Sequence, residues 1–355
     1  MDRLEEYLKN YVKNYTPYKG GQWCYEDGCV LKGCADLYEA GGDSFYLDFV
    51  LDFLDKAVDA DGTIPRYETE QYNIDSINTG KMLFFALDQT GKKKYEQAIF
   101  FHMQRLNEHP RCGSGNFWHK TLYPNQVWLD GLYMAQPFYA EYAARYGTKE
   151  QVQDIVRQFA FVREHMFNPE KGLYYHGCDT SKLQPWADRE TGCSANFWLR
   201  SMGWYLMALA DCIDKLGGEP YLEELFCEAI QGILPYADNQ TGLFYQVIDR
   251  ADATGNYLET SGSAMVGYAL LKGTRLGTIG QREAGLRIVS SLTDEKLKED
   301  GQGILRLTDI CAVAGLGPGE KRDGSVAYYL SEPKKDDDAK GVGPFMMAVG
   351  EAKRC

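Results

Sequence analysis

Pairs of amphipathic segments, joined by short turns that contain glycine, recur along most of this 355-residue chain. Four of the turns read EAGGDSF, DQTGKKKY, RYGTKEQ and LGGEPYLE. Short glycine turns between periodic apolar segments are typical of antiparallel helical hairpins. We predict twelve helices, near residues 2–14, 25–41, 43–59, 73–90, 92–106, 126–147, 149–167, 197–216, 221–237, 260–277, 280–293 and 340–353.

A second pattern follows several of these pairs. The stretches DADGTIPRY (59–67), GSGNFWHK (113–120), NPEKGLYYH (168–176) and DNQTGLFYQ (238–246) each contain a glycine before a short apolar or aromatic run. Four residues after that glycine stand Arg66, His119, His176 and Gln246. Helix, turn, helix and strand-like loop, repeated about six times, predict an all-α fold, the (α/α)6 barrel, with the loops around one mouth of a toroid. Because the hairpins close on each other, we expect one catalytic domain over residues 1–355, although length alone suggests two or three.

Composition narrows the classes of partner. The net charge of −13 argues against nucleic acid and anionic membranes, although a few local cations can still bind a small anion. Apolar runs such as 82–87 are too short to span a membrane, and MDRLEEYLKNYVKNY lacks the apolar core of a secretory signal. We therefore expect a cytoplasmic protein.

The ten cysteines contain no C-x-x-C pair, and several lie in apolar helical contexts. In a chain of this length, that distribution favours free buried thiols over a disulfide scaffold. Only five histidines are present, and none stands at ligand spacing from a cysteine, so no metal site is predicted.

Two aspartates are candidates for proton transfer. Asp130 is the one carboxylate in YPNQVWLDGLYMAQP (123–137), among aromatic and aliphatic residues. It either stabilises a helix start through the helix dipole or acts as a general acid, since apolar surroundings raise a carboxyl pKa toward the useful range. Asp75, in QYNIDSINTG, also opens a predicted inner helix. It is either an ordinary N-terminal residue or, if it faces Asp130, the second member of an acid/base pair.

Two histidines occupy equivalent places in the repeat. His119 precedes Lys120 in NFWHKTLYP, and His176 lies in GLYYHGCD. A histidine beside aromatic residues is often structural, but two at matching positions around one mouth favour contact with a ligand.

Trp198, Arg200 and Trp204 lie in NFWLRSMGWYLMALAD. Arg200 and Trp204 share a helix face, and an arginine on an apolar inner helix requires an anionic partner, either a protein carboxylate or one on the substrate. The alternative is a packed tryptophan with an arginine that extends to solvent. Tyr25, in GQWCYEDGCVLKGC, is a weaker candidate for a stacking surface.

In their order and spacing, these motifs resemble the unsaturated rhamnogalacturonyl hydrolases of glycoside hydrolase family 105. The resemblance covers nearly the whole chain and rests on QWCYEDGCVLKG, NIDSINTG, FWHK, YPNQVWLDGLYM, GLYYHGCD, PWADRETGCSANFWLRSMGWYLMALAD, TGLFYQ and ETSGSAM. It implies an (α/α)6 barrel that acts on short oligosaccharides ending in a 4,5-unsaturated galacturonyl residue, commonly linked to rhamnose. The implied partner is a small anionic oligosaccharide, and neither a metal nor an organic cofactor is implied.

The resemblance also implies roles for residues. Asp130 would protonate C4 of the enol-ether double bond and then activate the water that attacks C5, with Asp75 in the same site. Arg200 would bind the uronic carboxylate. Further family positions near the substrate are matched by Tyr25, His119, Lys120, His176, Trp198 and Trp204. One departure is Lys340 in DDDAKGVGPF, where we expect related sequences often to carry histidine, so the leaving sugar is less firmly implied than the reaction.

Two other functions fit the same pattern. An unsaturated glucuronyl hydrolase that acts on glycosaminoglycan fragments would share the fold and the chemistry, and a toroid could bind sugars without catalysis. The sequence does not fix the oligomeric state.

Overall fold

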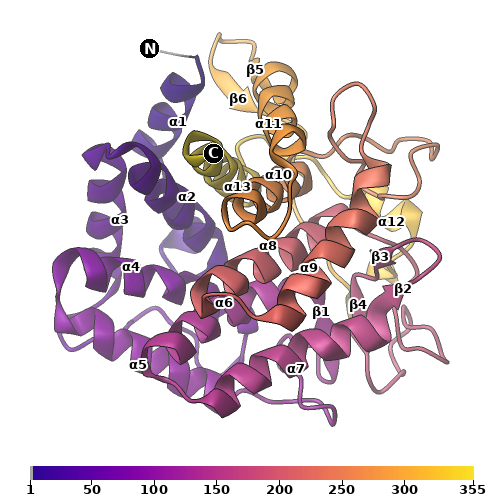
Figure 1. Cartoon of the computed structure of the whole chain (residues 1–355), viewed down its shortest axis with the longest axis horizontal. Coiled ribbons are helices and arrows are strands. Elements are labelled where there is room, and N and C mark those ends of the chain that lie inside the picture. Colours follow the sequence, from indigo (N-terminus) through magenta and orange to yellow (C-terminus); the bar gives the residue numbers. More distant parts are fainter. Residues whose placement is uncertain (1–2) are drawn as a thin grey trace.

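Helices dominate the computed structural model, which describes residues 3–355 (Figure 1). The α-helices are α1 (Arg3–Lys13), α2 (Tyr25–Gly41), α3 (Ser44–Ala57), α4 (Lys81–Thr90), α5 (Lys93–Asn107), α6 (Leu129–Tyr146), α7 (Lys149–Met166), α8 (Leu199–Leu216), α9 (Pro220–Ile233), α10 (Thr260–Arg275), α11 (Arg282–Ser291), α12 (Val326–Ser331) and α13 (Ala339–Arg354). Short strands form three antiparallel pairs: β1 (Gln126–Trp128) with β4 (Gly177–Asp179), β2 (Phe167–Asn168) with β3 (Leu173–Tyr174), and β5 (Leu297–Glu299) with β6 (Leu305–Leu307).

Burial separates inner helices from outer ones. α8 and α7 have the same length, yet 15 of the 18 residues of α8 are buried, against 5 of 18 in α7. α2, α6, α10 and α13 resemble α8, whereas α3, α9 and α11 bury mainly one side. A helix with one apolar stripe covers a core, and a helix that is apolar all round lies within it. Inner and outer helices therefore alternate along the chain, as the hairpin pattern predicts.

The ring closes where α13, the last inner helix, packs between α2 and α10. A Cβ on Gly343 of α13 would lie 2.6 Å from the carbonyl oxygen of Cys29 on α2, so glycine is what allows this close approach. α1 lies beside α2 and α13 (Figure 1), and its Glu5 pairs with Lys353 at 3.4 Å. The barrel prediction is confirmed, with one refinement: the sixth pair combines helices from the two ends of the chain.

A repeated hydrogen bond at one mouth explains the second sequence pattern. The carbonyl oxygen of a loop residue in one repeat accepts from the amide at the start of the preceding inner helix. The pairs, donor first, are Trp23 with Arg66 (3.2 Å), Ile74 with His119 (3.0 Å), Leu129 with His176 (3.0 Å), Leu199 with Gln246 (3.0 Å) and Thr260 with Asp309 (3.1 Å). Since helix N-termini have amides without intrahelical partners, each loop supplies one of the missing acceptors. The four residues matched in the sequence are thus equivalent in space.

Two predicted helices begin differently in the structure. The segment predicted as 73–90 starts as a 3-10 helix, Ile74–Gly80, in which the indole of Trp23 donates to the Ser76 carbonyl (2.9 Å) and takes that acceptor away from the helix. The segment predicted as 126–147 starts as strand β1, because its backbone pairs with β4. The β5–β6 pair and α12 were not predicted, since they lie outside the repeat.

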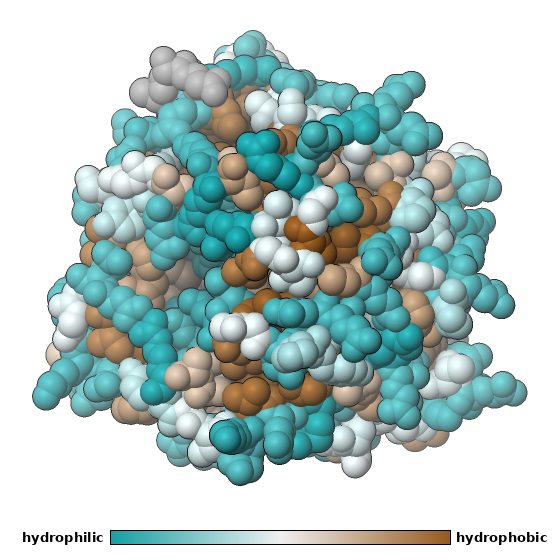
Figure 2. Space-filling model, viewed as in Figure 1, coloured by the Kyte–Doolittle hydropathy of each residue, from teal (hydrophilic) through white to brown (hydrophobic). Residues whose placement is uncertain are grey.

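The surface is mainly polar. Figure 2 shows hydrophilic side chains over most of one face, with hydrophobic residues visible between them in separate areas. Within residues 3–355, no helix combines the length and the hydropathy that crossing a membrane requires. The cytoplasmic location stays a prediction.

Candidate active site

The first turns of the inner helices carry the candidate catalytic side chains. Asp75, Asp130, Arg200 and Ser261 each directly follow a residue whose amide a loop carbonyl holds. The repeat therefore brings these four positions to the same mouth of the ring. The loop residues that accept those bonds supply a second set of side chains to the mouth, two of which are His119 and His176.

Asp130 faces His176. Oδ2 of Asp130 lies 3.3 Å from Nε2 of His176, which is fully buried. On the other side of the imidazole, Nδ1 shares a 2.8 Å hydrogen bond with the hydroxyl of Tyr329. A hydroxyl that donates there leaves the ring proton on Nε2, the nitrogen nearer the carboxylate. Oδ2 itself is buried, and no residue in the described part of the chain satisfies it with a well-aligned hydrogen bond.

Asp75 faces His119 in the same arrangement. Oδ1 of Asp75 lies 3.5 Å from Nε2 of His119. Burial raises the pKa of Asp75, with the charge of Lys120 opposing the rise and that of Asp130 adding to it. Burial also lowers the pKa of His119 to about 3, and the ammonium of Lys120 contributes in the same direction. His119 is therefore neutral near pH 7, and it stacks on Trp128 with the ring centres 4.2 Å apart.

Arg200 is buried, with 1% of its surface exposed. Its Nη1 donates to the carbonyl oxygen of Cys311 (2.5 Å) and to Oγ of Ser261 (3.2 Å). Glu259 holds both of these partners, because its Oε1 accepts from the Ser261 hydroxyl (2.7 Å) and from the Cys311 amide (3.0 Å). Within residues 3–355, Arg200 forms no direct ion pair with a carboxylate. The carboxylate of Glu259 therefore reaches Arg200 only through these shared partners, and no protein carboxylate in the described part of the chain contacts the guanidinium directly.

Aromatic rings connect these groups. Trp198 lies 4.7 Å from the ring of His176 and 5.0 Å from the guanidinium of Arg200. Trp204 stacks on Tyr133 at 4.9 Å and meets Tyr25 edge-on at 6.5 Å. Trp198 and Trp204 are therefore walls of the site rather than residues of the outer surface.

A cavity of about 310 Å³ at this mouth is lined by Tyr25, Asp75, Lys120 and Lys19, among others. Together with the contacts above, it joins all nine predicted site residues into one continuous cluster: Tyr25, Asp75, His119, Lys120, Asp130, His176, Trp198, Arg200 and Trp204. Their contact with a substrate stays a prediction.

Sequence reasoning missed three contributors. Trp128 separates the two histidines, stacked on His119 and 5.5 Å from His176, and only its position next to the helix start could have indicated it. Tyr329 comes from α12, outside the repeat, so no pattern pointed to it. Asp338, which opens α13, accepts from the backbone of Lys340 and pairs with its ammonium at 2.7 Å.

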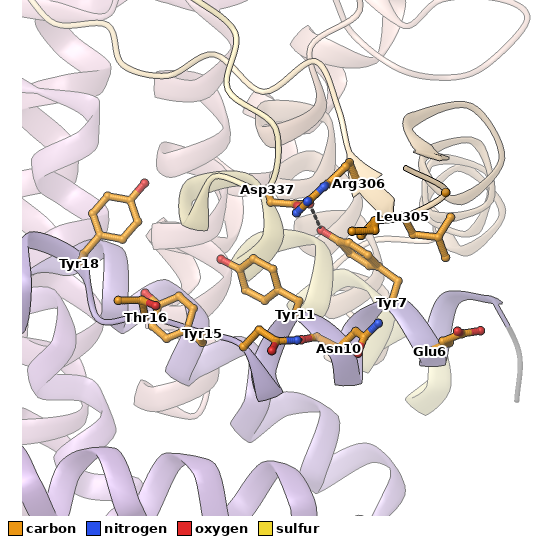
Figure 3. A pocket seen from close by; sticks show the side chains of 13 residues that line it. Glu6, Tyr7, Asn10, Tyr11, Tyr15, Thr16, Tyr18, Leu305, Arg306 and Asp337 are labelled. Carbon is orange, nitrogen blue, oxygen red and sulfur yellow. Dashed lines mark hydrogen bonds and ion pairs between the residues drawn. The ribbon is translucent and has the colours of Figure 1, made fainter. Parts of the chain in front are cut away.

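A groove on the outside of the ring lies beside the Asp338–Lys340 pair. Figure 3 shows it between α1 and the segment before α13, with Tyr7 and Tyr18 toward its two ends. The Tyr7 hydroxyl donates to Asp337 (2.7 Å), and the Tyr18 hydroxyl donates to Asp338 (2.7 Å). The groove encloses about 390 Å³, more than the cavity beside Asp75, but it contains none of the predicted catalytic groups. We therefore assign it a supporting role, as the wall that positions Asp338.

The described residues 3–355 contain no cluster of three or more His, Cys, Asp or Glu side chains suited to a metal ion. The absence of a cofactor stays a prediction.

Comparison with known proteins identifies the family. The model of Glycosyl Hydrolase Family 88 matches residues 1–355. The chain belongs to this family. A solved structure of a family 105 glycoside hydrolase from C. acetobutylicum ATCC 824 is 41% identical, covers 100% of both chains and superposes with a TM-score of 0.93. The predicted resemblance to family 105 and the toroid fold are thus confirmed, and the chain is a glycoside hydrolase.

Two curated relatives also match. Compared with the C. acetobutylicum structure, one covers less of this chain and the other is less identical to it. Protein Atu3128 of Agrobacterium fabrum is 42% identical to this family 88 member over 230 residues, which is 62% of this chain and 98% of the relative. The unsaturated rhamnogalacturonyl hydrolase YesR of Bacillus subtilis is 25% identical over 266 residues, 72% of each chain.

Proposed function

We propose that this family 88 glycoside hydrolase releases a 4,5-unsaturated galacturonyl residue from the non-reducing end of rhamnogalacturonan oligosaccharides. The observation that carries the proposal is the buried guanidinium of Arg200, which has no carboxylate partner among residues 3–355 and stands at the same mouth as Asp130. A buried charge that no opposite charge contacts directly costs free energy. A uronic carboxylate supplies that charge and matches the planar fork of arginine.

Asp130 is the group placed to transfer the proton. As a carboxylic acid it donates a proton to C4, and the positive charge that develops is shared by C5 and the ring oxygen. Water then attacks C5 and returns a proton to the carboxylate of Asp130, which restores the acid. The hemiketal formed at C5 opens by breaking the C5–O5 bond, which gives a ketone at C5 and a hemiacetal at C1. The hemiacetal then collapses to an aldehyde, the C1–oxygen bond to the remaining sugar breaks, and the proton of the O5 hydroxyl ends on the leaving oxygen. One water is consumed for each bond cleaved.

The other polar groups position these partners. His176, 3.3 Å from Asp130, is held by Tyr329 and fixes the direction of the carboxyl group. Asp75 orients sugar hydroxyls or the water. Trp198 and Trp204 provide flat apolar surfaces for the faces of the sugar rings.

The choice of rhamnogalacturonan as the substrate rests on fewer observations than the choice of reaction. It is supported by the motifs shared with family 105 and by the likeness to YesR. Lys340 and Asp338, at the start of α13, are the groups of this chain best placed to meet the leaving sugar.

A panel assay tests the proposal. Unsaturated disaccharides from rhamnogalacturonan, homogalacturonan and chondroitin are each incubated with the protein, and the ultraviolet absorption of the conjugated alkene is followed. We expect the fastest loss of absorption with the rhamnogalacturonan substrate. Fastest loss with the chondroitin substrate would replace our assignment with a glucuronyl hydrolase. No loss with any of the three would leave a toroid that only binds sugars.

A further inference from the structure

Two cysteines face each other beside the candidate active site. Cys178 lies in β4, and an isolated antiparallel bridge pairs it with Cys193, at the far end of the loop 180–192. The amide of Asp179 donates to the Gly192 carbonyl (2.9 Å), and the amide of Ser194 donates to the Gly177 carbonyl (2.9 Å). These two bonds flank the cysteines without involving them. The cysteines therefore form a non-hydrogen-bonded pair, the type in which opposed side chains lie closest.

This register matches the geometry of a disulfide. Directly opposed residues of that type have Cα atoms about 4.5 Å apart, and disulfides join Cα atoms separated by roughly 4.4–6.8 Å. Both cysteines are free thiols, with 2% and 3% of their surfaces exposed. In this reduced form the Cys193 thiol donates to the carbonyl oxygen of His165 (3.0 Å), and the Cys178 thiol lies 3.9 Å from that of Thr191. The register therefore places the two side chains where a disulfide can join them.

We propose that Cys178 and Cys193 are a reversible redox modification site, at which a cross-strand disulfide closes the loop 180–192. The co-reactant is a small-molecule disulfide such as glutathione disulfide. One cysteine thiolate attacks it, forming a mixed disulfide and releasing one glutathione. The second cysteine then attacks the mixed disulfide and releases the other glutathione. Two protein thiols are oxidised to one disulfide, one glutathione disulfide is reduced to two thiols, and the two thiol protons end on glutathione.

The loop gives access to the buried sulfur atoms. It contains no regular secondary structure, and the side chain of Leu183 is 73% exposed. Segments of this kind open locally more readily than helices of the core. A transient opening exposes the two thiols, and the disulfide then prevents the next opening.

The site is connected to the catalytic machinery. His176 stands two residues before Cys178, on the segment whose carbonyl holds the start of α6. Trp186 of the loop packs in one apolar cluster with Trp128, on which His119 stacks. A disulfide at the base of the loop thus restrains the walls of both carboxylate–histidine pairs.

Trypsin provides a sharp test, because Lys182 and Arg189 lie in the loop between the two cysteines and both are exposed. The full chain is equilibrated with reduced or oxidised glutathione, remaining thiols are alkylated, and the protein is digested with trypsin and examined by mass spectrometry. In the oxidised sample we expect a peptide containing Cys178 linked to one containing Cys193, and the loss of two of the ten titratable thiols. Dithiothreitol should reverse both, and the oxidised form should melt a few degrees higher.

Three variants complete the test. Cys178→Ser and Cys193→Ser should each abolish the link, whereas Cys112→Ser, which removes a third buried thiol close to Thr180, should leave it intact. Separate alkylation of both cysteines in the oxidised wild-type protein would overturn the proposal, and so would a link from either cysteine to Cys112. The wild-type digest decides the matter even if a variant fails to fold. No substrate is used, so the outcome is independent of the proposed function.

Discussion

Two carboxylate–histidine pairs occupy equivalent places in the repeat, and they differ in what surrounds them. The Asp130–His176 pair is backed by a hydrogen bond of 2.8 Å between the Tyr329 hydroxyl and Nδ1 of His176. In the Asp75–His119 pair, Nδ1 of His119 is buried and receives no hydrogen bond from the described residues. The first imidazole is therefore fixed in direction by two polar partners, whereas the second is fixed by stacking on Trp128.

The cationic surroundings differ as well. Lys120 and Lys19 act on Asp75 electrostatically, and both line the cavity beside it. We infer that one repeat motif supplies two functions in this chain, because the polar and charged neighbours of its two carboxylates differ. We assign proton transfer to the Asp130 pair and substrate orientation to the Asp75 pair.

The largest expected effect separates the two aspartates. Asp130→Asn should lower kcat at least about a hundredfold, the lower end of the contribution of general acid–base catalysis. Asp75→Asn should lower kcat by much less and raise KM, because it loses orienting contacts only. Steady-state kinetics on the preferred unsaturated disaccharide measures both. Equal losses of kcat in the two variants would remove the distinction, provided that their melting temperatures show both to be folded.

The second prediction concerns stability in acid. His119 is neutral in the folded protein, with its pKa lowered to about 3, but it titrates near 6.5 when unfolded. The unfolded state therefore binds more protons below pH 6.5, and stability falls with falling pH. Between pH 6.5 and pH 5, wild type should lose about 2 kcal/mol more unfolding free energy than His119→Phe, which keeps a ring on Trp128.

Urea unfolding at several pH values measures this difference. Parallel stability curves for wild type and His119→Phe would show that this imidazole is not held neutral by the fold.

A third prediction tests the support behind His176. Tyr329→Phe removes one hydroxyl but keeps the ring stacked on Trp198, 6.0 Å away. Loss of one hydrogen bond worth about 1.4 kcal/mol should lower kcat about tenfold, with KM little changed. Tyr328→Phe is the control, because the Tyr328 hydroxyl accepts from the Gly315 amide and does not bond His176. An unchanged kcat in Tyr329→Phe would make the two pairs more alike than we propose.

The smallest expected effect is on thermal stability. Burial raises the pKa of Asp75 above its ordinary 3.8, so the folded protein binds this proton more tightly than the unfolded chain. The contribution of the Asp75 carboxyl to the free energy of unfolding is therefore present at low pH and is lost as pH rises past about 4. Asp75→Asn should therefore raise the melting temperature by a few degrees at pH 7 and by less near pH 4. Asp52→Asn, at a side chain that is 65% exposed, should show no such difference.

Periodicity made the scaffold predictable. A glycine turn or an aromatic strand-like loop is specified by neighbouring residues, so the helices, the loop histidines and the helix-start aspartates could be found without a structure. In the sequence, His119 and His176 each stand four residues after a glycine. In the structure, the backbone carbonyl of each accepts the same kind of hydrogen bond from the start of an inner helix.

The remaining features depend on contacts between distant segments. Tyr329 reaches His176 from a short helix that has no counterpart in the repeat. The pairing of Cys178 with Cys193 depends on the register of a two-residue contact, and a shift by one residue would separate the thiols. The strand at 126–128 was predicted as helix because its partner strand lies about fifty residues away along the chain.

The closure of the ring by α13 has a consequence for how the chain reaches its native state. α2 precedes its partner α13 by nearly the whole described chain, so it is synthesised well before that partner. Until α13 leaves the ribosome, the face of α2 that carries Cys29 and Gly33 has no cover, and exposed apolar surface of this kind promotes aggregation. We therefore expect the ring to complete its core only after the sixteen residues of α13 have been made.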